Sequence, residues 1–211
     1  MITIKLGFVL ICTLILNQSI AQEITKLPEP HKTGGKPLMQ AMNERHSSRD
    51  FIDKDLTQQQ ISDLLWAAYG INRPEEGKHT VATSRNVQDM EVYLTTKDGA
   101  YLYLPKDNSI QKVLDKDIRE VTGKQDFVKV AAVNLVYVSD FSKAGNGTDE
   151  VKTMTAATHC GFIGQNVYLY CASEGLISVF RAYFDNAEVS KALNLSENKH
   201  VIYCQTVGYS K

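Results

Sequence analysis

The hydrophobic residues of this sequence change their spacing from a helical to an alternating pattern near residue 89. Before that point, Thr57 and Gln60 have the spacing of a capping box, and apolar residues then recur at helical intervals. After it, apolar and polar residues alternate over residues 90–95, and the turn sequence Lys97-Asp98-Gly99 predicts a β-hairpin that returns over residues 101–104. The chain therefore combines helices and strands in one fold.

The remaining elements are divided between the same two types. Helices are expected over residues 38–46, 57–69, 113–121, 149–173 and 185–193. Strands are expected over residues 131–138, 177–180 and 201–207, the last followed by a short tail, and residues 72–88 are expected to form a loop. Because helices and strands do not alternate strictly, the sequence predicts an α+β fold. We expect a mixed, mainly antiparallel sheet surrounded by helices, with a long central helix that is buried on several sides.

The first residues have the layout of a secretory signal. Lys5 ends a short positive region, residues 6–16 form a nearly uninterrupted apolar run, and Ser19-Ile20-Ala21 supplies small residues at a cleavage position. An apolar run of about 11 residues is shorter than the ~20 residues that span a bilayer. We therefore expect a cleaved export signal over residues 1–21, with a membrane anchor as the alternative, and a periplasmic location if the organism is Gram-negative.

The part of the chain after the signal is expected to be an arm followed by one domain. Residues 22–36 are polar and contain Pro28, Pro30 and a Gly34-Gly35 pair, which predicts an extended arm. Residues 37–211 are expected to form the domain, and no segment in it is apolar enough to predict a membrane span. The 23 basic and 24 acidic residues give a formal net charge of -1, which argues against a nucleic-acid-binding protein.

Cysteine chemistry is not expected to carry the function. Cys160 and Cys171 lie about 16 Å apart along the predicted long helix, too far for a disulfide, and either could meet Cys204 only if the fold brings them together. Buried free thiols are therefore expected. His159 and Cys160 are helix neighbours that point about 100° apart, which argues against a thiol hydrolase, and no Cys or His pair has zinc-ligand spacing.

Two arginines four residues apart, Arg45 and Arg49, flank Ser47. The fork of an arginine matches phosphate oxygens, and a serine hydroxyl adds a third donor, so this segment can converge on one anion if its backbone is extended or turning. The alternative is a solvated charged segment in which the arginines pair with Asp50 and Asp53.

Two later segments are also candidates for ligand binding. Residues 82–88 offer two hydroxyls, a guanidinium and two amides, which suit the edges of a polyol or a heterocycle, although the same residues could form a plain loop. Gly175 follows the predicted long helix, where a glycine permits left-handed backbone geometry and the close approach of a flat ligand. Alone, that glycine indicates only a helix C-cap.

In this order and spacing, the three segments resemble the FMN-dependent nitroreductase family over about residues 39–211. Arg45, Ser47 and Arg49 match in full the Arg-x-Ser-x-Arg signature of the family. Residues 82–88 match its Pro-Ser-x-x-Asn-x-Gln pattern, with Ala82 in place of the proline.

The rest of the resemblance lies near the end of the chain and in the middle. Glu174-Gly175-Leu176 matches a Glu-Gly-Leu turn after the central helix, and Gly208-Tyr209 matches the usual ending of family members. Residues 64–74, with the sequence LLWAAYGINRP, look especially like the branch that contains the thiazoline- and oxazoline-oxidising dehydrogenases.

The resemblance implies FMN as the cofactor and an intertwined homodimer with two flavin sites across its interface. Arg45 and Arg49 would hold the phosphate and ribityl chain, with Ser47 beside them, and backbone groups of residues 174–176 would face the flavin ring. The polar residues of the 83–88 loop would come from the opposite subunit, and the bulky Arg85 predicts a narrow or anion-preferring pocket. The candidate cofactor-binding residues are Arg45, His46, Ser47, Arg49, Thr83, Ser84, Arg85, Asn86, Gln88, Glu174, Gly175, Leu176 and, as a looser phosphate contact, Lys211.

The implied function is that of an exported flavoprotein oxidoreductase that transfers hydride through FMN to or from a small organic substrate. No catalytic side chain is expected, because the flavin ring itself carries the hydride. NAD(P)H is a cytoplasmic donor, so either an exported or membrane-bound redox partner reduces the flavin, or the enzyme oxidises its substrate and passes the electrons onward. The alternative is an exported flavin-binding module without turnover.

Overall fold

The computed structural model describes residues 23–211, so the signal expected over residues 1–21 lies outside the described part of the chain. Within residues 23–211, no helix has the length and apolar character needed to cross a bilayer.

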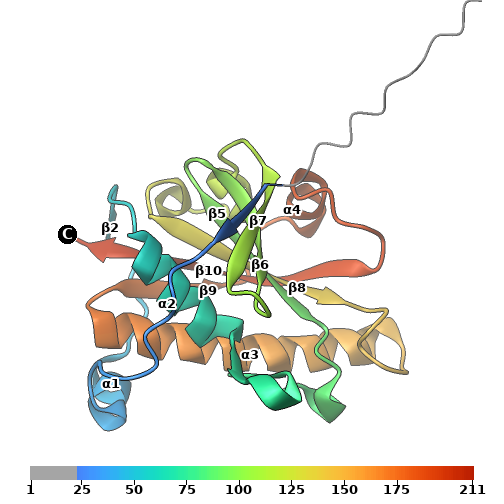
Figure 1. The fold of residues 1–211 in the computed structure, drawn as a ribbon. Coiled ribbons are helices and arrows are strands. Elements are labelled where there is room, and N and C mark those ends of the chain that lie inside the picture. Colours follow the sequence, from blue (N-terminus) through green and yellow to red (C-terminus); the bar gives the residue numbers. More distant parts are fainter. Residues whose placement is uncertain (1–22) are drawn as a thin grey trace, which may run out of the picture.

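A large antiparallel sheet occupies the centre of the fold (Figure 1). Its strands are β1 (Ile24–Lys26), β2 (Phe51–Ile52), β5 (Met90–Thr96), β6 (Gly99–Leu104), β7 (Ser109–Leu114), β8 (Val133–Asp140), β9 (Ile177–Arg181) and β10 (Lys199–Ser210). They pair in the order β1-β7-β6-β5-β8-β10-β2, and β9 also pairs with β10. All of these pairs are antiparallel, and an isolated parallel bridge joins Ser47 to Ser178. The strands β3 (Ile71–Arg73) and β4 (Lys78–His79) form a separate small sheet.

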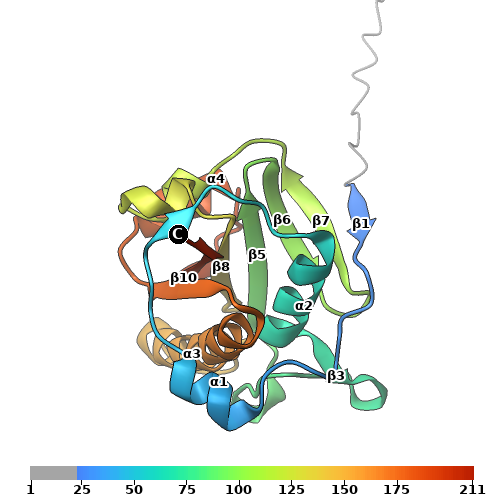
Figure 2. The same cartoon turned by 90° about the vertical axis from the view of Figure 1, so that its left-hand side faces the viewer.

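Helices cover both faces of the sheet. They are α1 (Leu38–Glu44), α2 (Gln58–Tyr69), α3 (Asp149–Glu174) and α4 (Asn186–Ala192). The predicted capping box at the start of α2 is present, because the Thr57 and Gln60 side chains each bond the backbone of the other residue. The helices α2 and α3 pack on one face, and α4 packs on the other (Figures 1 and 2). The predicted α+β fold is thereby confirmed.

Strand β8 lies at the middle of the core, and all eight of its residues are buried. Its side chains alternate between the two faces of the sheet. Leu135 and Tyr137 pack with the α2 and α3 side, whereas Val136 and Val138 pack with the α4 side. Because both faces are covered by helices, residues 135–138 at the centre of the strand are all apolar instead of alternating with polar residues.

The helix predicted over residues 113–121 is wrong. Residues 109–114 form β7, which pairs with β6 on one side and with β1 on the other, and only the short 3-10 turn Arg119–Thr122 is helical. The charged residues of the predicted helix follow β7, which itself contains one charged residue, Lys112. The predicted arm is also more structured than expected, because residues 24–26 are the strand β1 that pairs with β7.

Two further expectations are corrected by the structure. In the single chain, α3 is buried along one side, and its outer side exposes Val151, Met154 and Phe162 at 47%, 67% and 46%, so burial on several sides is wrong for this chain alone. The final strand also does not end at residue 207. It continues to Ser210, and its last residues pair with β2.

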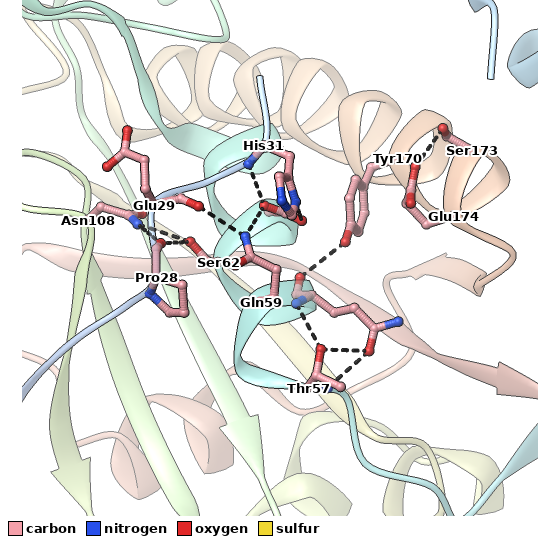
Figure 3. Close-up of polar contacts among 12 residues, drawn as sticks. Pro28, Glu29, His31, Thr57, Gln59, Ser62, Asn108, Tyr170, Ser173 and Glu174 are labelled. Atoms are coloured by element: carbon pink, nitrogen blue, oxygen red, sulfur yellow. Dashed lines mark hydrogen bonds and ion pairs between the residues drawn. The ribbon is translucent and has the colours of Figure 1, made fainter. Parts of the chain in front are cut away.

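The arm after β1 is attached to α2 by polar contacts (Figure 3). The Ser62 hydroxyl and the Asn108 side-chain amide both donate to the Pro28 carbonyl oxygen, at 2.5 and 2.8 Å. The His31 backbone amide donates to an Asp63 carboxylate oxygen at 2.8 Å. The arm therefore runs along α2 toward the end of α3.

Candidate functional site

The first candidate segment, residues 45–49, connects α1 to β2 as extended backbone. Arg45 leaves the end of α1 with φ −58° and ψ 122°. Ser47 forms the parallel bridge with Ser178 at the start of β9, and the Ser48 amide donates to the Ser178 carbonyl oxygen at 3.0 Å. The segment therefore meets the condition under which its two arginines can converge on one anion.

Tyr168 of α3 anchors this segment, and the sequence reasoning missed it. The Tyr168 hydroxyl accepts the Phe180 amide N–H at 2.8 Å and shares a hydrogen bond with Ser47 Oγ at 2.7 Å. The guanidinium carbon of Arg45 lies 5.1 Å from the centroid of the Tyr168 ring, within cation–π range. The sequence carries no signal for this tyrosine, because its role depends on where β9 returns against α3.

Arg45 and Arg49 have no carboxylate partner among residues 23–211. The ion pairs with Asp50 and Asp53 that the sequence left open as the alternative do not form within the described residues. Arg49 is exposed and Arg45 is partly exposed. Two guanidinium groups beside a serine hydroxyl therefore keep donors available for an anion.

The end of the chain and the turn after α3 lie beside the same segment. The Lys211 amide donates to the Asp50 carbonyl oxygen at 3.2 Å, which places the C-terminal residue next to residues 45–49. A small cavity of about 30 Å³ has as its lining residues Glu44, Arg45, His46, Tyr168, Cys171, Ala172, Leu176, Ile177 and Ser178. The structure thus brings the first segment next to residues 172 and 176–178 around the turn after α3, and it places Lys211 beside Asp50, the residue that follows the first segment.

The turn after α3 has one open side. Gly175 has φ 70° and ψ 24°, the left-handed C-cap conformation that the sequence predicted, and a side chain added there would meet no atom within 4 Å. The Gly175 and Leu176 amides both donate to the Cys171 carbonyl oxygen. Glu174 accepts a hydrogen bond from the Ser173 hydroxyl at 2.8 Å (Figure 3). The turn therefore offers an open surface and carbonyl groups to a flat ligand.

The second candidate segment, residues 83–88, is a strained loop. Arg85, Asn86 and Gln88 have φ values of 50°, 56° and 49°, in the left-handed region that residues with a side chain rarely adopt. The Gln88 amide donates to Thr83 Oγ1 at 3.1 Å, which closes the loop on itself. Most polar side chains of the loop face solvent. Backbone strain of this kind is typical of ligand-binding sites.

His159 of α3 anchors the 83–88 loop, in a role that sequence reasoning also missed. The Ser84 amide donates to His159 Nε2 at 2.8 Å. On its other side, His159 Nδ1 lies 2.8 Å from Asp89 Oδ1, and Asp89 Oδ2 accepts from the Ser139 hydroxyl at 2.6 Å. These three residues are at most 1% exposed. The loop is therefore fixed to the core through a buried chain of hydrogen bonds.

The charge state of this buried chain follows from its geometry. Burial by itself raises the pKa of Asp89, but hydrogen bonds from His159 and Ser139 outweigh it and hold that pKa below its usual value. Burial, together with the charge of Asp89, raises the pKa of the adjacent Cys160 thiol well above its usual value. Cys160 is a buried free thiol, as the sequence predicted.

The two anchors hold residues 45–49 and the 83–88 loop at different positions along α3. Tyr168 and His159 lie nine positions apart, which is roughly 13 Å of helix axis. Within the described residues, no hydrogen bond or ion pair joins the 83–88 loop to residues 45–49. In one chain, the second candidate segment therefore does not meet the other two, and we call these two separate groups of residues candidate half-sites.

A larger cavity lies between the arm, α2 and α3. Its volume is about 580 Å³, which is within the range of small-molecule sites. The walls include Trp66 and Tyr170, the arm glycines Gly34 and Gly35, and Glu174 of the turn after α3. Within residues 23–211, no group of His, Cys, Asp and Glu side chains is arranged to hold a metal ion.

Comparison with known proteins identifies the family. The chain is 28% identical over 171 residues to the "Putative nitroreductase" of Methanocaldococcus jannaschii, covering 76% of this chain and 85% of that one. A Ralstonia eutropha structure with the same description superposes with a TM-score of 0.85 at 34% identity, covering 89% of this chain and 90% of that one.

A more distant structure shares the fold. The NADPH:FMN oxidoreductase of Vibrio harveyi, complexed with NAD⁺, superposes with a TM-score of 0.62 at 20% identity over 82% of this chain and 69% of that one. Residues 42–209 match the family model described as "Nitroreductase family". On this match and on the fold, the chain belongs to the nitroreductase family.

Proposed function

We propose that this protein is an exported flavoprotein that binds FMN and transfers hydride to or from a small organic substrate, and that it works as a homodimer. Membership of the nitroreductase family supports an oxidoreductase. The observation that carries the FMN proposal is the pair Arg45 and Arg49, neither of which has an acidic partner within residues 23–211. An anionic group beside Ser47 would satisfy both.

The residues present fit FMN. Arg45 and Arg49 would bind the phosphate together with Ser47, and Lys211, which directly follows β10, is bound through its amide to the neighbouring Asp50 carbonyl. The open side of Gly175 would accept the flat ring, since no neighbouring atom fills the space that a side chain would take there. The fold neighbour from Vibrio harveyi is an FMN oxidoreductase, which is consistent with this cofactor. Bound FMN would supply hydride transfer, and the protein would bind and orient the two reactants.

The exposed apolar side of α3 supports the homodimer. Met154 and Phe162 on α3 are 67% and 46% exposed, and Met39 on α1 is 74% exposed. Large apolar side chains gathered on one side of a soluble protein are typical of an interface. A second copy on this face would also complete the half-sites, because the 83–88 loop of one copy would face residues 45–49 of the other. Light scattering of the purified protein tests the dimer directly.

The substrate and the route of the electrons are part of the same proposal. The 580 Å³ cavity that reaches Glu174 has room for a small organic molecule beside the flavin. The resemblance of residues 64–74 to the azoline-oxidising branch makes thiazoline and oxazoline compounds the first substrates to test. If residues 1–21 direct export, a redox partner outside the cytoplasm would reduce the flavin or accept its electrons.

The proposal predicts that FMN affinity depends on the two free arginines. Arg45→Ala and Arg49→Ala should each weaken FMN binding by about 1–3 kcal/mol, because each removes one charged hydrogen-bond donor from the phosphate. FMN affinity is measured by titrating the apoprotein with FMN and monitoring the quenching of flavin fluorescence. The matched control is Lys106→Ala, which removes an exposed positive charge at the turn between β6 and β7 and should leave the affinity unchanged.

Two results would overturn this proposal. Unchanged FMN affinity in both arginine variants would reject the phosphate assignment. A purified protein that stays colourless and monomeric with excess FMN would reject the flavoprotein as a whole. Turnover is tested by reducing the bound flavin and adding candidate acceptors, because a binding module without turnover would not be reoxidised by them.

A further inference from the structure

We propose that His159 is a positioning residue that holds the 83–88 loop in its ligand-binding conformation, and that protonation of His159 at Nε2 releases this loop. The inference rests on the proposed function, because the ligand in question is FMN. It extends that function by making cofactor binding sensitive to pH through a residue that does not touch the cofactor.

The hydrogen bonds assign one tautomer to His159. A backbone N–H can only donate, so the 2.8 Å contact from the Ser84 amide requires an unprotonated Nε2. The proton of the neutral ring then lies on Nδ1, where it is donated to Asp89. Asp89 is fixed in turn by the Ser139 hydroxyl at its other oxygen. The carboxylate thus selects the tautomer that can accept the loop.

The loop depends on this contact because its own backbone is strained. Arg85, Asn86 and Gln88 all have positive φ values, which cost conformational energy in residues with a side chain. Ser84 directly precedes these strained residues, and the hydrogen bond from its amide to His159 ties them to a helix of the core. Losing the tie allows residues 84–88 to relax into ordinary conformations.

A second proton on the ring turns an acceptor into a donor. The added proton occupies Nε2, since Nδ1 is already protonated, and the Ser84 N–H then faces another N–H. The imidazolium keeps its bond to Asp89 and gains charge attraction there. Protonation therefore strengthens one side of His159 and breaks the other, which separates the loop from α3 while the core pair stays intact.

Other ionisable groups lie around His159 and Asp89. Tyr69 of α2 and Cys160 of α3 both have a raised pKa, mainly through burial and also through the charge of Asp89. At the end of β8, the Asp140 amide donates to the Asp89 carbonyl oxygen at 2.8 Å. Burial raises the pKa of the Asp140 carboxyl, but hydrogen bonds from Ser142 outweigh it and hold that pKa below its usual value.

Four further charged or ionisable groups lie near this region. The charge of Glu91 on β5 adds to the rise in the pKa of Tyr69, and Glu91 forms an ion pair with Lys199 at 2.8 Å. Arg85 lies on the loop itself. His79 stacks on Tyr69 with ring centroids 4.0 Å apart, and burial lowers its pKa. Because His79 is a second histidine close to the loop, the experiment has to separate its titration from that of His159.

The first experiment uses the apoprotein and needs no flavin. Nitrogen-15 NMR of the imidazole rings should show His159 protonated at Nδ1 and unprotonated at Nε2 at pH 8. Exchange of the Ser84 amide, corrected for its intrinsic pH dependence, should be slow at pH 8 and should lose protection as His159 takes up its second proton. In His159→Gln, the side-chain oxygen accepts the Ser84 amide without titrating, so protection should persist to pH 5.5.

The second experiment follows FMN affinity from pH 8 to pH 5.5. The phosphate of FMN titrates near pH 6 in every variant, so the informative quantity is the difference between variants. The wild type should lose about tenfold more affinity than His159→Gln over this range, which corresponds to one broken hydrogen bond. Ser84→Pro removes the donor at an exposed position, the first of a 3-10 turn, which accepts proline. It should follow the profile of His159→Gln.

Each outcome decides one of the two proposals. Identical pH profiles in the wild type, His159→Gln and Ser84→Pro would overturn the role of His159 while leaving FMN binding established. A pH response that persists in Ser84→Pro would assign the effect to His79 or to another group. If no variant binds FMN at pH 8, the proposed function fails, and the Ser84 exchange experiment still tests whether His159 holds the loop.

Discussion

The two half-sites of this protein are anchored to the same helix by different means. Residues 45–49 have ordinary extended backbone, a bridge to β9 and the neutral hydroxyl of Tyr168 as their anchor. The 83–88 loop has three non-glycine residues with positive φ, and its anchor is a histidine bound to a buried carboxylate. The first half-site is held by the sheet itself, whereas the second depends on one buried chain of polar groups.

This difference indicates which part of the site is easier to disturb. Several backbone contacts to the sheet hold residues 45–49 and the strand that follows them, so the loss of one contact leaves the others in place. At the loop, the strain of the backbone is opposed by a short series of bonds in which each member orients the next. Substitutions in the two anchors should therefore differ both in size and in pH dependence.

The largest effect is expected from Asp89→Ala. It leaves the His159 ring and the Ser139 hydroxyl without their partner in the core, and we expect the free energy of unfolding to fall by about 3–5 kcal/mol at pH 7. Urea unfolding measures this. The matched control is Asp115→Ala, which removes a carboxylate that is 85% exposed and should cost less than about 1 kcal/mol.

The pH dependence gives this prediction a sign. Because the folded-state pKa of Asp89 lies below its usual value of about 3.9, its stabilisation is complete above that pH and is lost as the pH falls through the lowered pKa. The difference between wild type and Asp89→Ala should therefore shrink as the pH falls below about pH 4. A difference that keeps growing as the pH falls below about pH 4 would contradict the lowered pKa of Asp89.

An intermediate effect is expected from Tyr168→Phe. The ring under Arg45 is kept, but the Phe180 amide and Ser47 lose their hydroxyl partner, so the free energy of unfolding should fall by about 1–2 kcal/mol. FMN affinity should fall as well, without a change in its pH profile. Tyr170→Phe is the control on the same helix, since its hydroxyl makes only a 3.3 Å contact with the Gln60 carbonyl. Equal losses of stability in both variants would mean that Tyr168 is not a special anchor.

The smallest effect is expected from Arg85→Gly, and it should be stabilising. Glycine adopts the φ of 50° at this position without strain, so the free energy of unfolding should rise by up to about 1 kcal/mol. The control is Lys106→Gly, at an exposed position with negative φ, where glycine should lower stability by about 0.5–1 kcal/mol through added freedom of the unfolded chain. Thermal unfolding of both variants measures the contrast, and a loss of stability in Arg85→Gly would show that the loop is not strained.

Elements that local chemistry determines could be predicted from the sequence. The capping box at Thr57 and the Asp98-Gly99 turn each act within a few residues, and both are present in the structure. Strand β7 could not be predicted, because its pairing with β1 and β6 decides its conformation. The exposed side of α3 was missed because small and aromatic residues on several faces do not show which face packs in the same chain.

The site was predictable only in its residue types. The signature arginines and the glycine at the end of α3 are visible in the sequence, and the structure brings their segments together. The anchors are not visible, because Tyr168 lies 121 positions from Ser47 and His159 lies 75 positions from Ser84. A tautomer and a set of positive φ angles arise only once those distant contacts form.

The three free cysteines of the described residues lie where the long helix meets the sheet. Cys160 and Cys171 on α3 and Cys204 on β10 are at most 2% exposed, and burial raises the pKa of Cys204 to about 12. An alkylating reagent can therefore reach a reactive sulfur only after this layer has come apart. The natural thiols make the protein its own reporter of opening events, and mass spectrometry of the labelled chain can time the separation of helix and sheet without any introduced probe.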